Sequence, residues 1–137
     1  MVHKLHNLFI FPNAKISDVL ARMSANKKTL GVAPGIMLVA DKNKKLLGIA
    51  TNGDLRRAFA AGVSMDHPIS RAMNKNPSVI VAQGTNQHVL SLVFEKIKAG
   101  EWPRNRLENI LVVDDNHHVL DLGSVYDLVH TSDVRFK

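Results

Sequence analysis

The two halves of this 137-residue chain repeat each other. Residues 37–55, "MLVADKNKKLLGIATNGDL", align without a gap with residues 110–128, "ILVVDDNHHVLDLGSVYDL", at an offset of 73. Residues 11–20, "FPNAKISDVL", align with residues 81–90, "VAQGTNQHVL", at an offset of 70. The difference between the offsets places three extra residues in the second half, within residues 96–109. Because internal repetition decides architecture before local propensity does, we expect two similar structural units.

Each repeat has the same predicted order of elements. A short apolar strand ("NLFIF" or "SVIV") precedes a helix, two apolar runs joined by a tight turn follow, and a second helix ends the repeat. The turns, "DKNKK" and "DDNHH", supply Asp and Asn residues that tolerate left-handed backbone, so the flanking runs should pair as antiparallel strands. The predicted fold class is α+β, a tandem β-α-β-β-α repeat with two-fold pseudosymmetry. The two units are expected to bury the bare faces of their small sheets against each other.

The composition is that of one globular domain. Hydrophobic residues make up 45% of the chain and charged residues 22%, and no low-complexity run interrupts them. No apolar stretch reaches the length of about 20 residues that a membrane helix needs, and the N-terminal segment is wrongly flanked for a signal peptide. We therefore expect a cytoplasmic protein that does not associate with a membrane. The absence of cysteine excludes disulfides, thiolate metal sites and cysteine nucleophiles.

The formal net charge of +6 favours anionic partners in general. The basic residues are scattered in ones and twos and aromatic residues are few, which disfavours nucleic acid as the partner. His117 and His118 are adjacent in a turn with no third ligand nearby, so no metal site is expected. No nucleophile triad or carboxylate pair indicates an enzyme. Trp102 is expected either to pack over the adjacent helix or to cover a contact with a partner.

The stretch "GIATNGDLRRAF" contains the best candidate site. Thr51 and Asp54 approximate a capping box, which begins many ordinary helices. However, residues three apart share one helix face, so Thr51, Asp54 and Arg57 also form a stripe of hydroxyl, carboxylate and guanidinium beside the free N–H groups of a helix N-terminus. A carboxylate there can accept hydrogen bonds from vicinal ribose hydroxyls while the N–H groups and the guanidinium receive a phosphate. The stripe is thus either a cap or a nucleotide site.

The chain resembles a known family, the CBS (cystathionine-β-synthase) domain pair or Bateman module. The resemblance covers about Leu8 to Leu128 and rests on the β-α-β-β-α repeat and on the strand-to-helix signature G-h-x-T/S-x-x-D. It implies a single CBS-pair domain over residues 1–137, with motif one at about 7–62, a linker at about 63–70 and motif two at about 71–132. It also implies a cleft that binds AMP, ADP or ATP. In the family the Asp holds the ribose diol, the Thr or Ser holds ribose or phosphate, and the base rests on residues that open the first strand.

Carried over by position, the resemblance implies two nucleotide sites. The first site comprises Thr51, Asp54 and Arg57, with Asn7 and Leu8, next to His6, near the base. The second site comprises Ser124 and Asp127, with Asn76, Ser78 and Val79 opening the strand. Departures from the signature weaken the second site, because Asp121 replaces the Gly and His130 stands at the position of Arg57. Asn52 replaces the usual Asp at the first site and should reduce repulsion of phosphate, so we rank the first site ahead.

Two groups within the family are most similar to this chain. "TNGDLRRAFAAGVSMDHPISRAMNKNPSVIV" resembles CBS pairs joined to sugar-nucleotide transferases of surface-polysaccharide synthesis. The pairs joined to arabinose-5-phosphate isomerases share the signature but match the linker less well. The resemblance implies a regulatory adenine-nucleotide-binding module, homodimeric, that controls an attached or separate nucleotidyltransferase domain. The alternative is a structural module that dimerises or holds a partner without a ligand.

Overall fold

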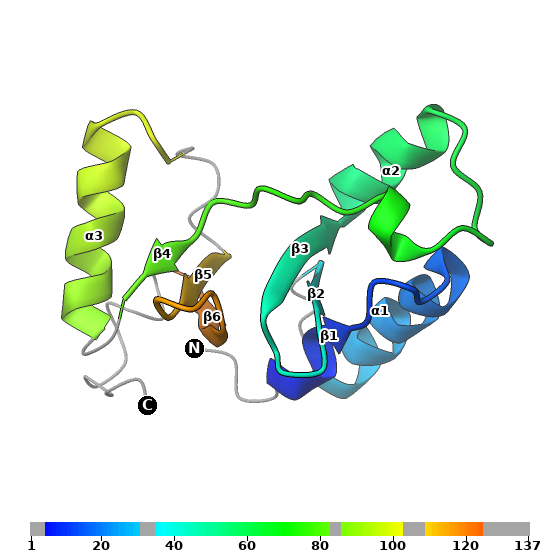
Figure 1. The fold of residues 1–137 in the computed structure, drawn as a ribbon, viewed down its shortest axis with the longest axis horizontal. Helices are drawn as coiled ribbons and strands as arrows, with labels where there is room; N and C mark the ends of the chain where they lie inside the picture. The colour runs from blue at the N-terminus through cyan, green and yellow to red at the C-terminus, as the bar shows by residue number, and fades with distance from the viewer. Residues whose placement is uncertain (1–4, 31–34, 83–85, 103–108, 125–137) are drawn as a thin grey trace. The chain divides into compact units, whose positions relative to one another are not determined.

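A computed structural model describes residues 5–30, 35–82, 86–102 and 109–124 (Figure 1). The chain divides into two compact units, with the boundary between Pro77 and Ser78. We call the unit up to Pro77 the first unit and the unit from Ser78 onward the second unit. Both combine a small sheet with helices, so the predicted α+β tandem repeat is confirmed. No helix in the described part of the chain has both the length and the apolar character that a membrane span requires.

The first unit is a three-stranded sheet with helices packed on one face. Its elements are η1 (Leu5–Leu8), β1 (Phe9–Ile10), α1 (Ile16–Leu30), β2 (Ile36–Ala40), β3 (Leu46–Thr51), α2 (Asn52–Ala60) and η2 (Ile69–Arg71). The strand order is β1-β2-β3, with β1 parallel and β3 antiparallel to β2. The antiparallel register pairs Ile36 with Thr51, so β3 ends, and α2 begins, beside the start of the central strand.

The second unit repeats this topology and its register. Its described elements are β4 (Ile80–Val81), α3 (Asn86–Lys98), β5 (Ile110–Val113) and β6 (Val119–Gly123). The pair Ile10 and Val39 becomes Ile80 and Val112, at the offsets of 70 and 73 found in the sequence. The hairpin also shifts register at the same place in both units, after Val39 and after Val112. The final helix predicted for this repeat lies outside the described residues.

The hairpin turns owe their shape to an aspartate in each repeat. Asp41 Oδ1 accepts the backbone N–H groups of Asn43 (2.8 Å) and Lys45 (3.1 Å). Asp114 makes the equivalent contacts, and the N–H of His118 contributes most to holding the pKa of this carboxyl below its usual range. The prediction that Asp or Asn takes the left-handed backbone was wrong, because the side chain of the aspartate is committed to capping the turn.

The left-handed residue of each turn is instead a basic or imidazole residue three positions after the aspartate. Lys44 has a φ of 65° and His117 a φ of 67°. Lys44 and His117 occupy equivalent positions in the two repeats although their side chains differ. The geometry of the turn is therefore set by the aspartate cap and not by the propensity of the residue with left-handed backbone. In the first unit, the Lys44 ammonium lies 5.6 Å from the centre of the Phe9 ring, a cation–π contact that favours this conformation.

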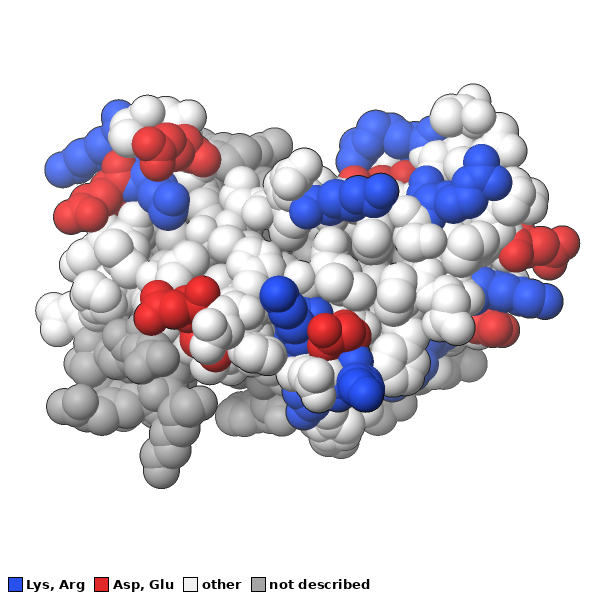
Figure 2. All heavy atoms as spheres, in the orientation of Figure 1, with Lys and Arg blue, Asp and Glu red and all other residues white. Residues whose placement is uncertain are grey.

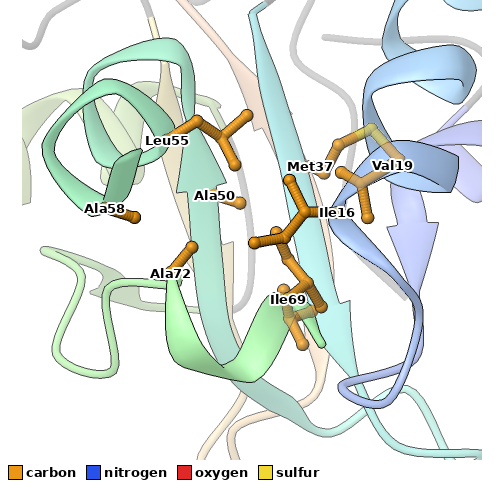
Figure 3. Close-up of a cluster of buried hydrophobic side chains, with 9 residues drawn as sticks. Ile16, Val19, Met37, Ala50, Leu55, Ala58, Ile69 and Ala72 are labelled. Carbon is orange, nitrogen blue, oxygen red and sulfur yellow. The ribbon is translucent and has the colours of Figure 1, made fainter. Parts of the chain in front are cut away.

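The core of the first unit joins both helices to the sheet and to the segment after α2. Met37, Val39 and Ala50 alternate along β2 and β3 and therefore face the same side of the sheet. Figure 3 shows side chains from α1, α2 and η2 converging on this face. Ile69 of η2 is fully buried and Ala72 is nearly so, three residues apart. The segment after α2 is therefore an integral part of the first unit's core.

The core of the second unit includes Trp102. This indole is 3% exposed and packs in a cluster with Val89 and Val93 of α3 and with Ile110 of β5. Of the two expectations for this residue, packing over the adjacent helix is confirmed.

Gly48 of β3 must lack a side chain because Met73 and Asn74 lie directly against it. Asn74 pairs with Ile49 through backbone hydrogen bonds of 3.0 and 2.8 Å, one in each direction. A Cβ on Gly48 would lie 2.7 Å from the Asn74 carbonyl oxygen and 2.9 Å from Met73 Sδ, closer than real Cβ contacts. The absence of a side chain at the signature glycine of the first repeat thus leaves room for the segment after η2 to pack against β3. Its counterpart in the second repeat is Asp121.

Gly48→Ala is expected to lower the free energy of unfolding by about 1–3 kcal/mol, because a methyl group is forced against backbone that cannot move away freely. The control is Gly53→Ala in α2, where the new Cβ meets the flexible guanidinium of Arg57 at 3.2 Å. That change should be neutral or stabilising by up to about 1 kcal/mol, since alanine is the better helix former. Urea denaturation of both variants measures the change in the free energy of unfolding. Equal changes in the two variants would contradict the close approach of Met73 and Asn74 to Gly48.

Candidate functional site

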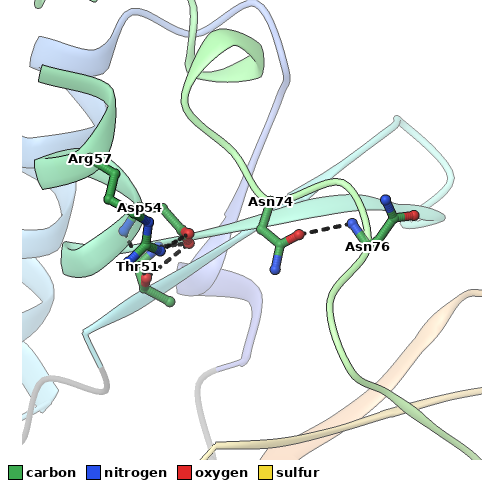
Figure 4. Close-up of polar contacts among 5 residues, drawn as sticks. All are labelled: Thr51, Asp54, Arg57, Asn74 and Asn76. Atoms are coloured by element: carbon green, nitrogen blue, oxygen red, sulfur yellow. Dashed lines mark hydrogen bonds and ion pairs between the residues drawn. The ribbon is translucent and has the colours of Figure 1, made fainter. Parts of the chain in front are cut away.

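The start of α2 is a complete capping box. Thr51 has extended backbone (φ −109°, ψ 169°), and its Oγ1 accepts the Asp54 N–H at 3.2 Å. Asp54 Oδ2 in turn accepts the Thr51 N–H at 3.0 Å and the Thr51 hydroxyl at 2.8 Å (Figure 4). The short side chain of Asp54 therefore reaches back to the backbone N–H of Thr51 and completes the capping box. Of the two interpretations of this motif, capping is present in the structure.

The same carboxylate also holds the arginine of the stripe. Arg57 Nη2 lies 2.6 Å from Asp54 Oδ1, so the two carboxylate oxygens have different partners. The Asp54 side chain is 7% exposed, whereas that of Arg57 is 67% exposed. An ion pair three residues apart on a helix contributes only about 0.2–0.5 kcal/mol, so a competing anion or hydroxyl can displace it at little cost.

A hollow of about 440 Å³ opens beside this stripe, between α2 and residues 71–74, which comprise the end of η2 and the segment that follows it. Asp54, Arg57 and Ala58 line one side of it. The other side consists of Arg71, Ala72, Met73 and Asn74. Its size is within the range of small-molecule sites. The sequence did not predict this second wall. The signal for it in the sequence is Gly48, because any larger residue there would collide with Met73 and Asn74.

The hollow carries more positive than negative charge. Arg57 is offset by Asp54, whereas the guanidinium of Arg71 has no hydrogen-bond or ion-pair partner among the described residues. In the face drawn in Figure 2, basic side chains lie over the region of α2 and the segment that follows it, with acidic atoms showing between them. One uncompensated cation in a concave site favours an anionic ligand.

The structure does not bring the other residues predicted for the first site to this hollow. Leu8 is fully buried. Asn7 is half-buried, and its carbonyl accepts the side-chain amide of Asn26 at 3.1 Å. Neither residue lines the hollow. Asn76, which was predicted for the second site, belongs to the first unit. It is exposed, its backbone N–H donates to Asn74 Oδ1 at 3.0 Å, and it does not line the hollow.

The remaining predicted residues belong to the second unit. Ser78, Val79 and Ser124 are half-buried there. Asp127, like His130, lies outside the described residues. Asp121, at the position of the signature glycine, accepts the N–H of Leu122 at 2.8 Å with its own side chain.

A larger hollow of about 570 Å³ lies at the other end of the first sheet. It is lined by Phe9 and Phe11 together with residues of α1 and of the β2–β3 turn, and by His6 from the predicted base segment. Thr51, Asp54 and Arg57 are absent from its lining. Within the described residues, no group of three His, Cys, Asp or Glu side chains is placed to bind a metal ion.

Comparisons with known proteins agree with this fold. Residues 2–61 match the CBS domain family. The chain is 35% identical over 119 residues to the arabinose 5-phosphate isomerase KdsD of Francisella tularensis, covering 86% of this chain and 33% of that protein. It therefore spans about a third of the length of this curated relative.

Two solved structures show the same fold across most of the chain. The CBS-domain-containing protein of Agrobacterium tumefaciens has a TM-score of 0.56 at 22% identity, over 89% of this chain and 86% of that one. The cytosolic domain of the Mg²⁺ channel MgtE, solved in complex with ATP, has a TM-score of 0.60 at 14% identity, over 89% and 43%. Residues 2–61 thus match the CBS domain family, and the chain shares its fold with solved CBS-domain structures.

Proposed function

We propose that this chain is a regulatory module that binds an adenine nucleotide (AMP, ADP or ATP) at the start of α2. The observation that carries the proposal is one hollow that combines a nearly buried carboxylate, Asp54, with two guanidiniums, those of Arg57 and Arg71. A carboxylate suits a ribose diol and guanidiniums suit phosphate. The match of residues 2–61 to the CBS domain family supports this assignment, as does the ATP in the structure of the MgtE domain.

Binding would proceed by exchange of partners within the stripe. A ribose hydroxyl replaces Arg57 on Asp54 Oδ1, while Oδ2 continues to accept the Thr51 N–H and so keeps the helix capped. The released guanidinium of Arg57, already 67% exposed, turns to the phosphate. The free N–H groups of the α2 N-terminus add a favourable field for the anion. Asp54 therefore serves both as cap and as ligand.

Other parts of the proposal extend beyond this site. Asn7 and Leu8 are proposed to lie near the base, and we propose that the whole chain forms one CBS pair. Its second site has Asn76, Ser78 and Val79 at the strand and Ser124 and Asp127 at the signature.

We propose that the nucleotide controls a sugar-processing catalytic domain, attached or separate. The sequence favours a nucleotidyltransferase, whereas one curated relative is an arabinose 5-phosphate isomerase, of which this chain matches about a third. Both groups fit a regulatory module that reports nucleotide level to sugar metabolism.

The alternative is a structural module in which Thr51 and Asp54 act only as a cap. The complete capping box is what this alternative requires. Acid extraction of the purified protein, followed by nucleotide chromatography of the supernatant, separates the two. The proposal expects an adenine nucleotide in the extract or taken up by the emptied protein, and the alternative expects neither.

The protein is expected to form a homodimer in solution. The end of α2, "RAFAAG", presents small residues suited to close helix packing, and Phe59 there is 38% exposed. Light scattering at tens of micromolar should give about twice the chain mass of 15.1 kDa. A mass of one chain would rule the dimer out.

A further inference from the structure

We propose that Arg71 reads a second phosphate, so that the hollow prefers ADP or ATP to AMP. This inference rests on the proposed function, because it names which nucleotides the same hollow selects. It starts from Arg71, a residue of the segment after α2 that lines the hollow opposite Arg57. Arg57 and Asp54 are paired with each other, whereas Arg71 has no ionic partner within the described part of the chain.

The position of Arg71 is fixed by the fold. It ends η2, between the fully buried Ile69 and the nearly buried Ala72. The Ile69 N–H donates to the Ala14 carbonyl at 2.7 Å, and the Ala72 N–H donates to the Ile69 carbonyl at 2.9 Å. Beyond Ala72, Asn74 is held on β3 by its paired backbone hydrogen bonds with Ile49. The backbone at Arg71 is therefore ordered before any ligand arrives, which lowers the cost of binding.

Two guanidiniums on opposite walls match two phosphates better than one. Arg57 follows Asp54 on the same helix face, so it lies next to the ribose end of a nucleotide that Asp54 holds. Arg71 comes from the other wall, and each guanidinium can bind one phosphate with two parallel hydrogen bonds. A monophosphate satisfies one arginine and leaves the other in water. A diphosphate engages both, so Arg71 discriminates by phosphate number.

Calorimetry at fixed salt with AMP and ADP tests this on the parent, on Arg71→Ala and on Arg71→Lys. The parent should bind ADP about tenfold more tightly than AMP, and Arg71→Ala should remove this difference by weakening ADP alone. Lysine keeps the positive charge but cannot form the two parallel hydrogen bonds of a guanidinium, so Arg71→Lys should retain part of the preference for ADP over AMP. The matched control is Arg56→Ala, an exposed arginine of α2 that does not line the hollow, and it should leave both affinities unchanged.

Equal losses on AMP and ADP in Arg71→Ala, or no loss on either, would overturn the role of Arg71 while leaving the proposed function in place. If the parent binds no adenine nucleotide, the proposed function fails. The role of Arg71 is then decided with inorganic pyrophosphate and phosphate as probes. Tighter binding of pyrophosphate that Arg71→Ala abolishes supports a two-phosphate site, and binding that is indifferent to Arg71 rejects it.

Discussion

Asp54→Asn is expected to weaken AMP binding by about ten- to a hundred-fold while α2 stays capped. The change removes the negative charge that ribose hydroxyls bond to, and charge-assisted hydrogen bonds of this kind contribute roughly 1.5–3 kcal/mol. Asparagine retains one oxygen, which can still accept the Thr51 N–H as Asp54 Oδ2 does at 3.0 Å. Calorimetry measures the affinity, and urea denaturation of the same samples measures the stability.

The outcome separates the two interpretations of the stripe. If Asp54→Asn binds AMP as tightly as the parent, the residue is a cap alone, whether or not the change also lowers stability. Arg57→Ala is the companion variant, and it should weaken AMP far more than adenosine, since adenosine has no phosphate for the guanidinium to bind. Asp54→Asn should weaken both ligands. If Arg57→Ala loses equal affinity for AMP and adenosine, or loses affinity for neither, Arg57 does not bind the phosphate.

Ile69→Ala is expected to lower the free energy of unfolding by about 2–5 kcal/mol, the largest effect we expect on stability. The side chain is fully buried in the core of the first unit, and its removal leaves a cavity beneath η2. Because Ile69 anchors the segment that carries Arg71 and Asn74, ligand affinity should fall as well. Thermal or urea denaturation measures the loss of stability.

Met65→Ala is the control for this effect, since Met65 belongs to the same connection but is 48% exposed. It should change the free energy of unfolding by no more than about 0.5 kcal/mol. Similar losses in the two variants would mean that the segment is not built into the core as its burial indicates.

Much of the fold could be predicted because the repeat supplies each element twice. The offsets of 70 and 73 recur as register partners, Ile10 with Val39 and Ile80 with Val112. The register agrees in the two repeats because a shift by one residue would turn the apolar side chains of a buried strand away from the core. The stripe of Thr51, Asp54 and Arg57 could also be predicted, because its contacts span only three residues.

The second wall of the hollow could not be predicted in the same way. Arg71 and Asn74 reach the stripe through a backbone crossing at Ile49, a contact between distant positions that local periodicity does not encode. Nor could the sequence decide where the Asp54 carboxylate points, since a cap and a ligand require the same residue at the same spacing. The left-handed residues of the turns were misplaced because the aspartate's hydrogen bonds, rather than residue propensity, decide that geometry.

Calorimetry of the purified chain with AMP, ADP, ATP and CMP tests whether the start of α2 binds an adenine nucleotide. We expect saturable binding of at least one adenine nucleotide, weaker or undetectable binding of CMP, and adenine-nucleotide binding that is about ten- to a hundred-fold weaker in Asp54→Asn. CMP carries the same ribose and phosphate as AMP, so it isolates the contribution of the base. If none of the three adenine nucleotides binds, the start of α2 is not a nucleotide site, and Thr51 and Asp54 act as a helix cap.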